Sequence, residues 1–387
     1  MKRLCVAFCL ATVFALLLAA SASAARPNPT KMKLPTGFSH IGAPVHSFTT
    51  ASGHVVHYVD QGKKSWRTLV LVGGAGTGVQ AFELTEFTRA LRNKLNIRVV
   101  CVERNGLGMT KFEPADASGE MIAHDAGDDA LALADPVKTR EMYAENVIEL
   151  LDHLGINRFS VLGISAGGPY TGEIVRQAGA RVRSVHFAVA VNQRAAGAQY
   201  PDPAYLANRR NAIINPMVWW DMTGTTADMI PGWQERAYEE ASWSAFVRGQ
   251  DADPHAVAMD YTILQMTAPD VSMVTAPVFT YYGAKDPSVS YAERDKWVAA
   301  FTSSRKITQR NYPDRVHDVQ YRHYDQILLD VAGYGDYRII GFKGQTRVCL
   351  LYTSDAADDL LCVDLGGRRI IKKKQQQHLN YATRGYI

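Results

Sequence analysis

The pentapeptide GISAG at residues 163–167 decides the fold of this chain. The apolar and β-branched run before it, RFSVL at 158–162, predicts a buried strand, and PYTGEIVRQA at 169–178 predicts a helix. Ser165 is therefore expected on a sharp strand-to-helix turn, where a side chain at Gly163 or Gly167 would collide with neighbouring elements. Such a turn presents the serine hydroxyl and points the helix N-terminus toward any negative charge that develops beside it.

An acid and a histidine follow this serine in the chain order Ser, Asp, His. Asp286 comes just after the predicted strand 278–282, in YYGAKDPSV, and His317 follows the next predicted strand, in YPDRVHDVQ. Loops at the carboxyl ends of parallel strands are where open α/β sheets gather functional groups. We therefore expect Asp286 to orient His317, and His317 to take the proton of Ser165.

Other residues compete for these two roles. Asp286 precedes Pro287 and could be a turn residue only. Asp314 and Asp318 are rival acids, although each is too near His317 in sequence to reach the far ring nitrogen from another strand. Among the other histidines, His153 lies in a predicted helix, His186 in a predicted strand and His323 inside the final predicted helix.

A glycine-rich loop, VGGAGTG at 72–78, follows the predicted strand 68–72. It predicts an oxyanion hole formed by backbone N–H groups of Ala75 and Ala166, with Gly73 and Gly74 allowing the backbone to come close. Such a loop could instead hold a pyrophosphate, but no GxGxxG spacing fits and no Lys-Ser/Thr pair follows. No cofactor is implied, and no HExxH or comparable cluster implies a metal.

Short apolar segments alternate with amphipathic ones along most of the chain. This rhythm predicts an α/β fold, with a mostly parallel central sheet and helices on both faces, within a domain at 38–340. From 192 to about 275 the rhythm stops and Trp and Met accumulate, which predicts an inserted helical cap. The predicted strands are 45–50, 54–60, 68–72, 97–102, 159–162, 182–191, 278–282 and 306–312, and the predicted helices are 83–95, 137–154, 170–178, 291–301 and 319–331.

The two ends of the chain differ in character from its middle. Residues 1–24 predict a signal peptide, with Lys2 and Arg3, an apolar run and a small-residue cleavage site, and hence a secreted or lumenal protein. An uncleaved membrane anchor is the alternative, since the apolar run approaches the length of a bilayer span. Residues 348–387 resemble translated sequencing-adaptor sequence and are predicted to be non-native; a disordered basic tail is the alternative.

The charge of the chain argues against nucleic-acid binding, and its cysteines suggest a buried thiol. The 42 Lys and Arg include two in 1–24 and six in 348–387, and the 38 Asp and Glu include four in 348–387, so the middle carries 34 of each. A neutral domain without a basic stripe gives no support for nucleic-acid binding, and the expected partner is a small molecule. Cys101, the one cysteine of that middle, sits in a strand-like run and is expected to be buried.

These motifs together resemble the α/β-hydrolase fold superfamily, in its cap-bearing serine hydrolase form. The resemblance rests on VGGAG at 72–76, ERNGLGMT at 103–110, the GISAG region at 146–174, PVFTYYGAKDPSV at 277–289 and RVHD at 315–318. It implies an esterase, lipase, peptidase, thioesterase, carbon–carbon hydrolase or cofactor-free haloperoxidase. Gly73 stands where many relatives have histidine, and Thr110 where they have serine. Ser165 stands where relatives that open epoxides or remove halogens have aspartate.

The resulting expectation is a serine hydrolase that forms an acyl-enzyme, on a carboxylic ester or a related acyl substrate. Two alternatives remain open from sequence. One is a catalytically silent α/β-hydrolase domain that serves as a binding module, and the other is a lyase or perhydrolase that uses the same three residues. The oligomeric state is not predicted by any feature of the sequence.

Overall fold

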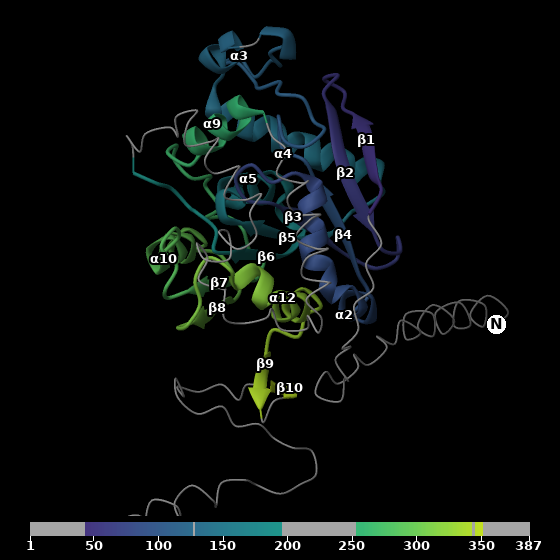
Figure 1. Cartoon of the computed structure of the whole chain (residues 1–387), viewed down its shortest axis with the longest axis vertical. Coiled ribbons are helices and arrows are strands. Elements are labelled where there is room, and N and C mark those ends of the chain that lie inside the picture. The colour runs from purple at the N-terminus through teal and green to yellow at the C-terminus, as the bar shows by residue number, and fades with distance from the viewer. Residues whose placement is uncertain (1–42, 127, 196–252, 343–344, 351–387) are drawn as a thin grey trace, which may run out of the picture. The chain divides into compact units, whose positions relative to one another are not determined.

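The computed structural model describes residues 43–126, 128–195, 253–342 and 345–350 (Figure 1). The chain divides into one compact unit from Pro35 to Gly335 and a second that comprises Met1–Leu34 and Asp336–Ile387. The described part of the second unit is a hairpin of β9 (Tyr337–Phe342) and β10 (Gln345–Leu350), which pair antiparallel. The described elements of the fold that follow belong to the first unit.

The centre of this unit is an eight-stranded sheet within the described residues, in the order β1-β2-β4-β3-β5-β6-β7-β8. β1 and β2 form an antiparallel hairpin and β2 also pairs antiparallel with β4, whereas the strands from β4 to β8 pair parallel. The mostly parallel sheet predicted from the sequence is thereby confirmed. The strands are β1 (Val45–Thr49), β2 (Val55–Gln61), β3 (Arg67–Val72), β4 (Ile97–Val102), β5 (Phe159–Ile164), β6 (Val182–Ala188), β7 (Val278–Gly283) and β8 (Ile307–Tyr312).

Sequence composition accounts for which strands lie in the middle. Every residue of β4, β5 and β7 is buried, as is expected of parallel strands covered on both faces. β1, at one edge of the sheet, has only partly buried and exposed residues. The hairpin that joins β1 to β2 turns at Gly53, whose φ of 87° lies in the left-handed region that glycine tolerates.

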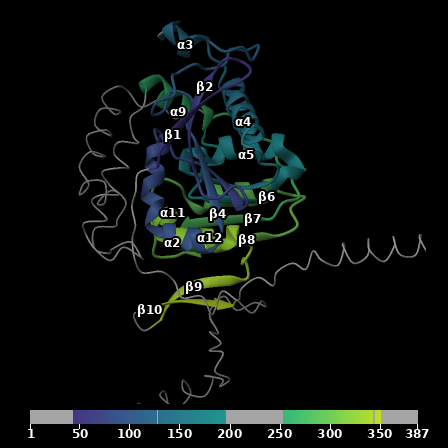
Figure 2. The ribbon, with the colours of Figure 1, turned by 90° about the vertical axis from the view of Figure 1, so that its right-hand side faces the viewer.

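Helices cover both faces of the sheet, as Figure 2 shows: α4 and α5 lie together on one face, and α2 and α12 lie on the other. α10 belongs with α5, because Trp297 of α10 stacks on Phe187 of β6 with ring centroids 4.2 Å apart and lies against Gly172 of α5. The helices are α2 (Arg89–Lys94), α3 (Asp128–Leu133), α4 (Pro136–His153), α5 (Gly168–Ala178), α9 (Pro254–Ile263), α10 (Tyr291–Ala300), α11 (Val319–Arg322) and α12 (Tyr324–Val331), with 3-10 turns η2 (Val79–Thr88), η3 (His124–Ala126), η4 (Ser165–Gly167) and η5 (Gly179–Arg181).

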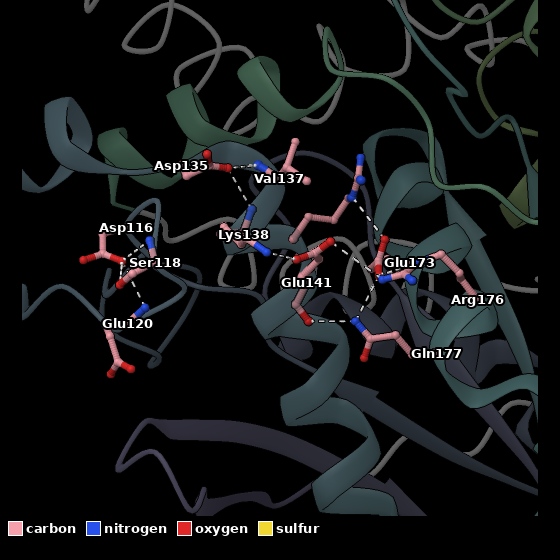
Figure 3. Close-up of polar contacts among 11 residues, drawn as sticks. Asp116, Ser118, Glu120, Asp135, Val137, Lys138, Glu141, Glu173, Arg176 and Gln177 are labelled. Carbon is pink, nitrogen blue, oxygen red and sulfur yellow. Dashed lines mark hydrogen bonds and ion pairs between the residues drawn. The ribbon is translucent and has the colours of Figure 1, made fainter.

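Polar contacts fix α5 against α4 (Figure 3). Asp135 caps α4 by accepting hydrogen bonds from the N–H groups of Val137 and Lys138, at 2.8 and 2.9 Å. Gln177 of α5 donates to the Glu141 carbonyl of α4 at 3.2 Å and to Glu173 of its own helix at 2.9 Å. Because α5 begins directly after the GISAG turn, the hydrogen bond from Gln177 to α4 helps to fix the direction in which that turn points.

Three predicted elements differ from the structure. The predicted helix 83–95 is instead η2 followed by the short α2, and the predicted helix 319–331 is interrupted at His323, which separates α11 from α12. The prediction that His323 lies inside a helix was therefore wrong. Strand β6 ends at Ala188 and not at 191, because Val189 adopts a left-handed φ of 43° that a strand does not accommodate.

Several predicted features lie wholly or partly outside the described residues. The signal peptide at 1–24 lies outside them, and so do residues 196–252 of the predicted cap; α9 is the described helix of the 192–275 range. Of the predicted tail at 348–387, Val348 to Leu350 belong to β10, so its first residues do have strand structure. Within the described part of the chain, no helix is both long and apolar enough to cross a bilayer.

Candidate functional site

The site lies where four parallel strands end. The loop Gly73–Gly78 follows β3, the GISAG turn follows β5, Asp286 comes three residues after β7, and His317 lies in the loop between β8 and α11. Because β3, β5, β7 and β8 run parallel in one sheet, their carboxyl ends share an edge. The topology thus brings together residues up to 244 positions apart in the chain, counted from Gly73 to His317.

The GISAG turn has the strained geometry predicted for it. Ser165 has a left-handed φ of 51°, a conformation that costs a non-glycine residue about 1–2 kcal/mol. A β-carbon on Gly167 would lie 2.6 Å from the Gly73 carbonyl oxygen and 2.7 Å from that of Val72, and one on Gly163 would overlap the Thr171 hydroxyl. The two glycines therefore allow β3, β5 and α5 to approach closely around the serine.

The three predicted catalytic side chains form one hydrogen-bonded chain. His317 Nε2 lies 3.1 Å from Ser165 Oγ, and His317 Nδ1 lies 2.7 Å from Asp286 Oδ2. An ionised carboxylate only accepts hydrogen bonds, so the imidazole proton belongs on Nδ1 and leaves Nε2 as the acceptor for the serine hydroxyl. The other carboxylate oxygen of Asp286 accepts from the N–H groups of Ser288 and Val289 at 2.8 and 2.9 Å, which fixes the orientation of the carboxylate.

The rival acids make other contacts. Asp314 is exposed, and its Oδ1 lies 3.6 Å from Lys285 Nζ. Asp318 is buried and is hydrogen-bonded through Oδ2 to Arg322 and through Oδ1 to the Val316 N–H. The structure therefore directs both carboxylates away from His317 and toward partners of their own.

The glycine-rich loop lies directly against the GISAG turn. A β-carbon on Gly74 would be 3.2 Å from Ser165 Cβ, so a larger residue at that position would crowd the serine. Ala75 and Ala166, the predicted oxyanion donors, are both buried, and Ala166 lies in η4, one residue after the serine. The loop and the turn thus flank Ser165 from two sides.

A small cavity opens beside this loop and is mostly apolar. Burial raises the pKa of Cys101, one of the residues that line it, to about 12, so the thiol stays neutral at physiological pH and is a poor nucleophile. The prediction that Cys101 is buried is confirmed. The lining residues are Leu71, Gly73, Gly74, Thr77, Gly78, Phe82, Thr85, Cys101, Ile164 and Tyr321.

Two charged residues to which the sequence assigned no role, Arg104 and Asp260, contact the Gly73–Gly78 loop. Arg104 donates to the carbonyl oxygens of Gly73 and Gly74 at 2.6 and 2.7 Å, and it pairs with Asp260 of α9 at 2.8 Å. The motif ERNGLGMT marked the position of Arg104 as part of the resemblance without giving it a role. No local signal marks Asp260, which lies 156 residues later in the chain.

Among residues 43–126, 128–195, 253–342 and 345–350, no group of three or more His, Cys, Asp or Glu side chains could hold a metal ion.

Comparison with solved structures places this arrangement in a known fold. An α/β-hydrolase fold protein from Nakamurella multipartita superposes with a TM-score of 0.51 and 18% identity, over 75% of this chain and 100% of that one. This chain has the α/β-hydrolase fold. An esterase from Rhodococcus sp. ECU1013 (TM-score 0.52, 15% identity) and an enol-lactonase from Burkholderia xenovorans LB400 (0.51, 16%) also match, each over 75% of this chain and 98% and 99% of theirs.

Sequence comparison adds no closer relative. No protein-family model matches the chain, and no curated protein matches it. The α/β-hydrolase fold is thus recognised through structure, and it agrees with the resemblance that the sequence motifs carry.

Proposed function

We propose that this α/β-hydrolase-fold protein is a serine hydrolase that cleaves a carboxylic ester or a related acyl substrate through an acyl-enzyme. The observation that carries the proposal is the continuous hydrogen-bonded chain from Ser165 through His317 to Asp286, at the carboxyl edge of the sheet. Two structural neighbours are an esterase and an enol-lactonase, which agrees with an acyl substrate.

The geometry supports acylation by a conventional route. Ser165 Oγ attacks the substrate carbonyl carbon while its proton passes to His317 Nε2, 3.1 Å away. The resulting oxyanion receives hydrogen bonds from the backbone N–H groups of Ala75 and Ala166. When the tetrahedral intermediate collapses, the carbon–oxygen bond to the leaving alcohol breaks, and Nε2 gives its proton to that alcohol.

Deacylation repeats these steps with water as the nucleophile. The water oxygen attacks the acyl carbon while His317 Nε2 takes a proton from the water. The bond between the acyl carbon and Ser165 Oγ then breaks, and Nε2 returns the proton to Oγ. Asp286 accepts a hydrogen bond from the His317 Nδ1–H group at 2.7 Å throughout, so the imidazolium formed in each half-reaction stays oriented and stabilised.

A fluorophosphonate probe tests the proposal, because it reacts with activated serine nucleophiles. The protein should be labelled and should hydrolyse a chromogenic short-chain ester, whereas Ser165→Ala should lose the label and at least about three orders of magnitude in turnover. Circular dichroism should show that the variant is still folded. A folded parent protein without label would favour the binding-module alternative, and label without ester hydrolysis would favour a lyase or perhydrolase.

Localisation extends the same proposal. The predicted signal at residues 1–24 supports a protein that is exported and cleaved near Ala25. N-terminal sequencing of the exported protein tests this, and a membrane-bound product that still begins at Met1 would instead support the uncleaved anchor.

A further inference from the structure

A buried ion pair lies on the side of the glycine-rich loop that carries its carbonyl groups. Arg104 follows β4 and Asp260 lies in α9, and both side chains are only 2–3% exposed. Charges buried to this degree lose their hydration, and the attraction between them does not by itself make such a pair stabilising. A buried Arg–Asp pair therefore calls for an account of what its hydrogen bonds hold in place.

The Arg104 guanidinium holds two consecutive peptide groups of the loop. Its Nη1 donates to the Gly73 carbonyl at 2.6 Å, and its Nη2 donates to the Gly74 carbonyl at 2.7 Å. In a trans peptide the C=O and the following N–H point in opposite directions, so fixing the Gly74 carbonyl toward Arg104 also fixes the direction of the Ala75 N–H. A cationic donor on the carbonyl further polarises the peptide and strengthens its N–H as a donor.

Asp260 in turn holds the guanidinium. Its Oδ2 lies 2.8 Å from Arg104 Nη2 and accepts from the Gly76 N–H at 3.4 Å, while its Oδ1 accepts from the Tyr170 hydroxyl at 2.7 Å. The Tyr170 ring of α5 packs against the guanidinium, with Arg104 Cζ 4.9 Å from the ring centroid. Burial alone would lower the pKa of Arg104, but the Asp260 carboxylate raises it above its ordinary value, so the cation persists.

We propose that Arg104 and Asp260 are positioning residues of the acyl-transfer reaction, which hold the Gly73–Gly78 loop so that its N–H groups meet the oxyanion formed at Ser165. The proposal rests on the serine hydrolase function proposed above. It assigns a role to Asp260, a residue within the range 192–275, in building the oxyanion hole. Segments on three different elements, β3, β4 and α9, thereby meet at the loop.

The same unit contains a matched control pair. Arg310 and Asp330 are equally buried, with Nη2 and Oδ1 2.7 Å apart; Arg310 donates to the Gly335 carbonyl at 2.8 Å, and Asp330 accepts from the Tyr281 hydroxyl at 2.8 Å. The buried ion pair, a backbone carbonyl that accepts from the arginine and a tyrosine hydroxyl that donates to the aspartate are thus common to both pairs, but the carbonyl held here belongs to Gly335 and not to the loop. Loss of either carboxylate should lower the stability of the fold, but only loss of the Asp260 carboxylate should lower the rate of the reaction.

Kinetics of Asp260→Asn and Asp330→Asn on a chromogenic ester separate these effects. Asp260→Asn should lower kcat by about tenfold or more with little change in KM. The reason is that the loop N–H groups contact the oxyanion, which forms in the transition state and is absent from the bound substrate. Arg104→Lys should also lower kcat, since one ammonium group cannot reproduce the planar guanidinium that donates to both carbonyl oxygens. Asp330→Asn should lower the melting temperature yet leave kcat unchanged. Equal kcat values for the folded Asp260→Asn and Asp330→Asn variants would overturn the proposal.

Hydrogen exchange gives a readout that does not require activity. Amides of residues 73–78 should exchange faster by about tenfold or more in Asp260→Asn than in Asp330→Asn, since loss of the anchor raises local opening. If Asp260→Asn does not fold, Tyr170→Phe, which removes one hydrogen bond to Asp260, should still speed exchange of this loop above the parent level. Unchanged exchange would defeat the positioning role, whereas fast exchange in a protein that no probe labels would defeat only the serine hydrolase function.

Discussion

At the scale of single residues, the choice of acid can be tested by one substitution and its control. Asp286→Asn should lower kcat by about three to four orders of magnitude, because the amide that replaces the carboxylate can stabilise the wrong imidazole tautomer and no longer stabilises the imidazolium. Asp314→Asn is the matched control, since Asp314 is exposed and pairs with Lys285. Steady-state ester hydrolysis by both variants gives the answer. A large loss in Asp314→Asn, with Asp286→Asn near the parent rate, would transfer the role to Asp314.

Residues with a local sequence signal were predictable, and residues without one were not. Ser165, Asp286 and His317 each follow a strand in a recognisable segment, and the structure brings their side chains within hydrogen-bonding distance. Asp260 has no such signal, because its importance comes from a contact with Arg104 that only the tertiary fold creates. A carboxylate in a helical segment is most often solvated, so nothing in the sequence distinguishes this one.

At the scale of elements, the close approach of α5, β3 and β5 depends on Gly167. Gly167→Ala would place a methyl group 2.6 Å from the backbone oxygen of Gly73, which cannot move as a flexible side chain can. We expect a loss of about 1–3 kcal/mol in the free energy of unfolding, as for other overpacked sites, together with a lower turnover. Urea unfolding and ester hydrolysis measure the two effects.

The other end of the same helix supplies the control for this substitution. Gly179 caps α5 with a φ of 52°, and a β-carbon there would meet no atom within 4 Å. Gly179→Ala should therefore lower the free energy of unfolding through its backbone conformation alone, a φ of 52° with a ψ of −119° that favours glycine, and should leave turnover unchanged. Equal turnover in the two variants would mean that the GISAG turn tolerates a side chain at Gly167.

Elements with a strong hydrophobic pattern were predicted to within a few residues, whereas their interruptions were not. The buried strands β3, β4 and β7 match the predicted ranges closely, because runs of apolar residues leave little doubt about burial. The break at His323 and the 3-10 turn η2 come from tertiary packing that overrides local helix propensity. His323 stacks on Tyr312 of β8 with ring centroids 3.9 Å apart, a contact that no local pattern reveals.

At the scale of the whole molecule, two buried histidines should make stability depend on pH. Burial lowers the pKa of His54 to about 4; burial, followed by the charges of Arg67 and Arg310, lowers that of His186 to about 3. Both pKa values lie below the unfolded value of 6.5, so the unfolded chain binds more protons as the pH falls. The stabilisation is thus complete above about pH 6.5 and declines below it, by about 3 kcal/mol for each histidine at pH 4.

Replacing one of these histidines measures how much it contributes to the change of unfolding free energy with pH. His186 lies between Ser184 at 2.8 Å and Tyr281 at 3.0 Å, and His186→Gln would keep a polar group there that does not titrate. Urea unfolding at several pH values between 5 and 6 should then show a slope of unfolding free energy against pH that is lower by about 1 kcal/mol per pH unit. A parental slope in His186→Gln would mean that this imidazole takes up its proton in the folded state as readily as in the unfolded chain.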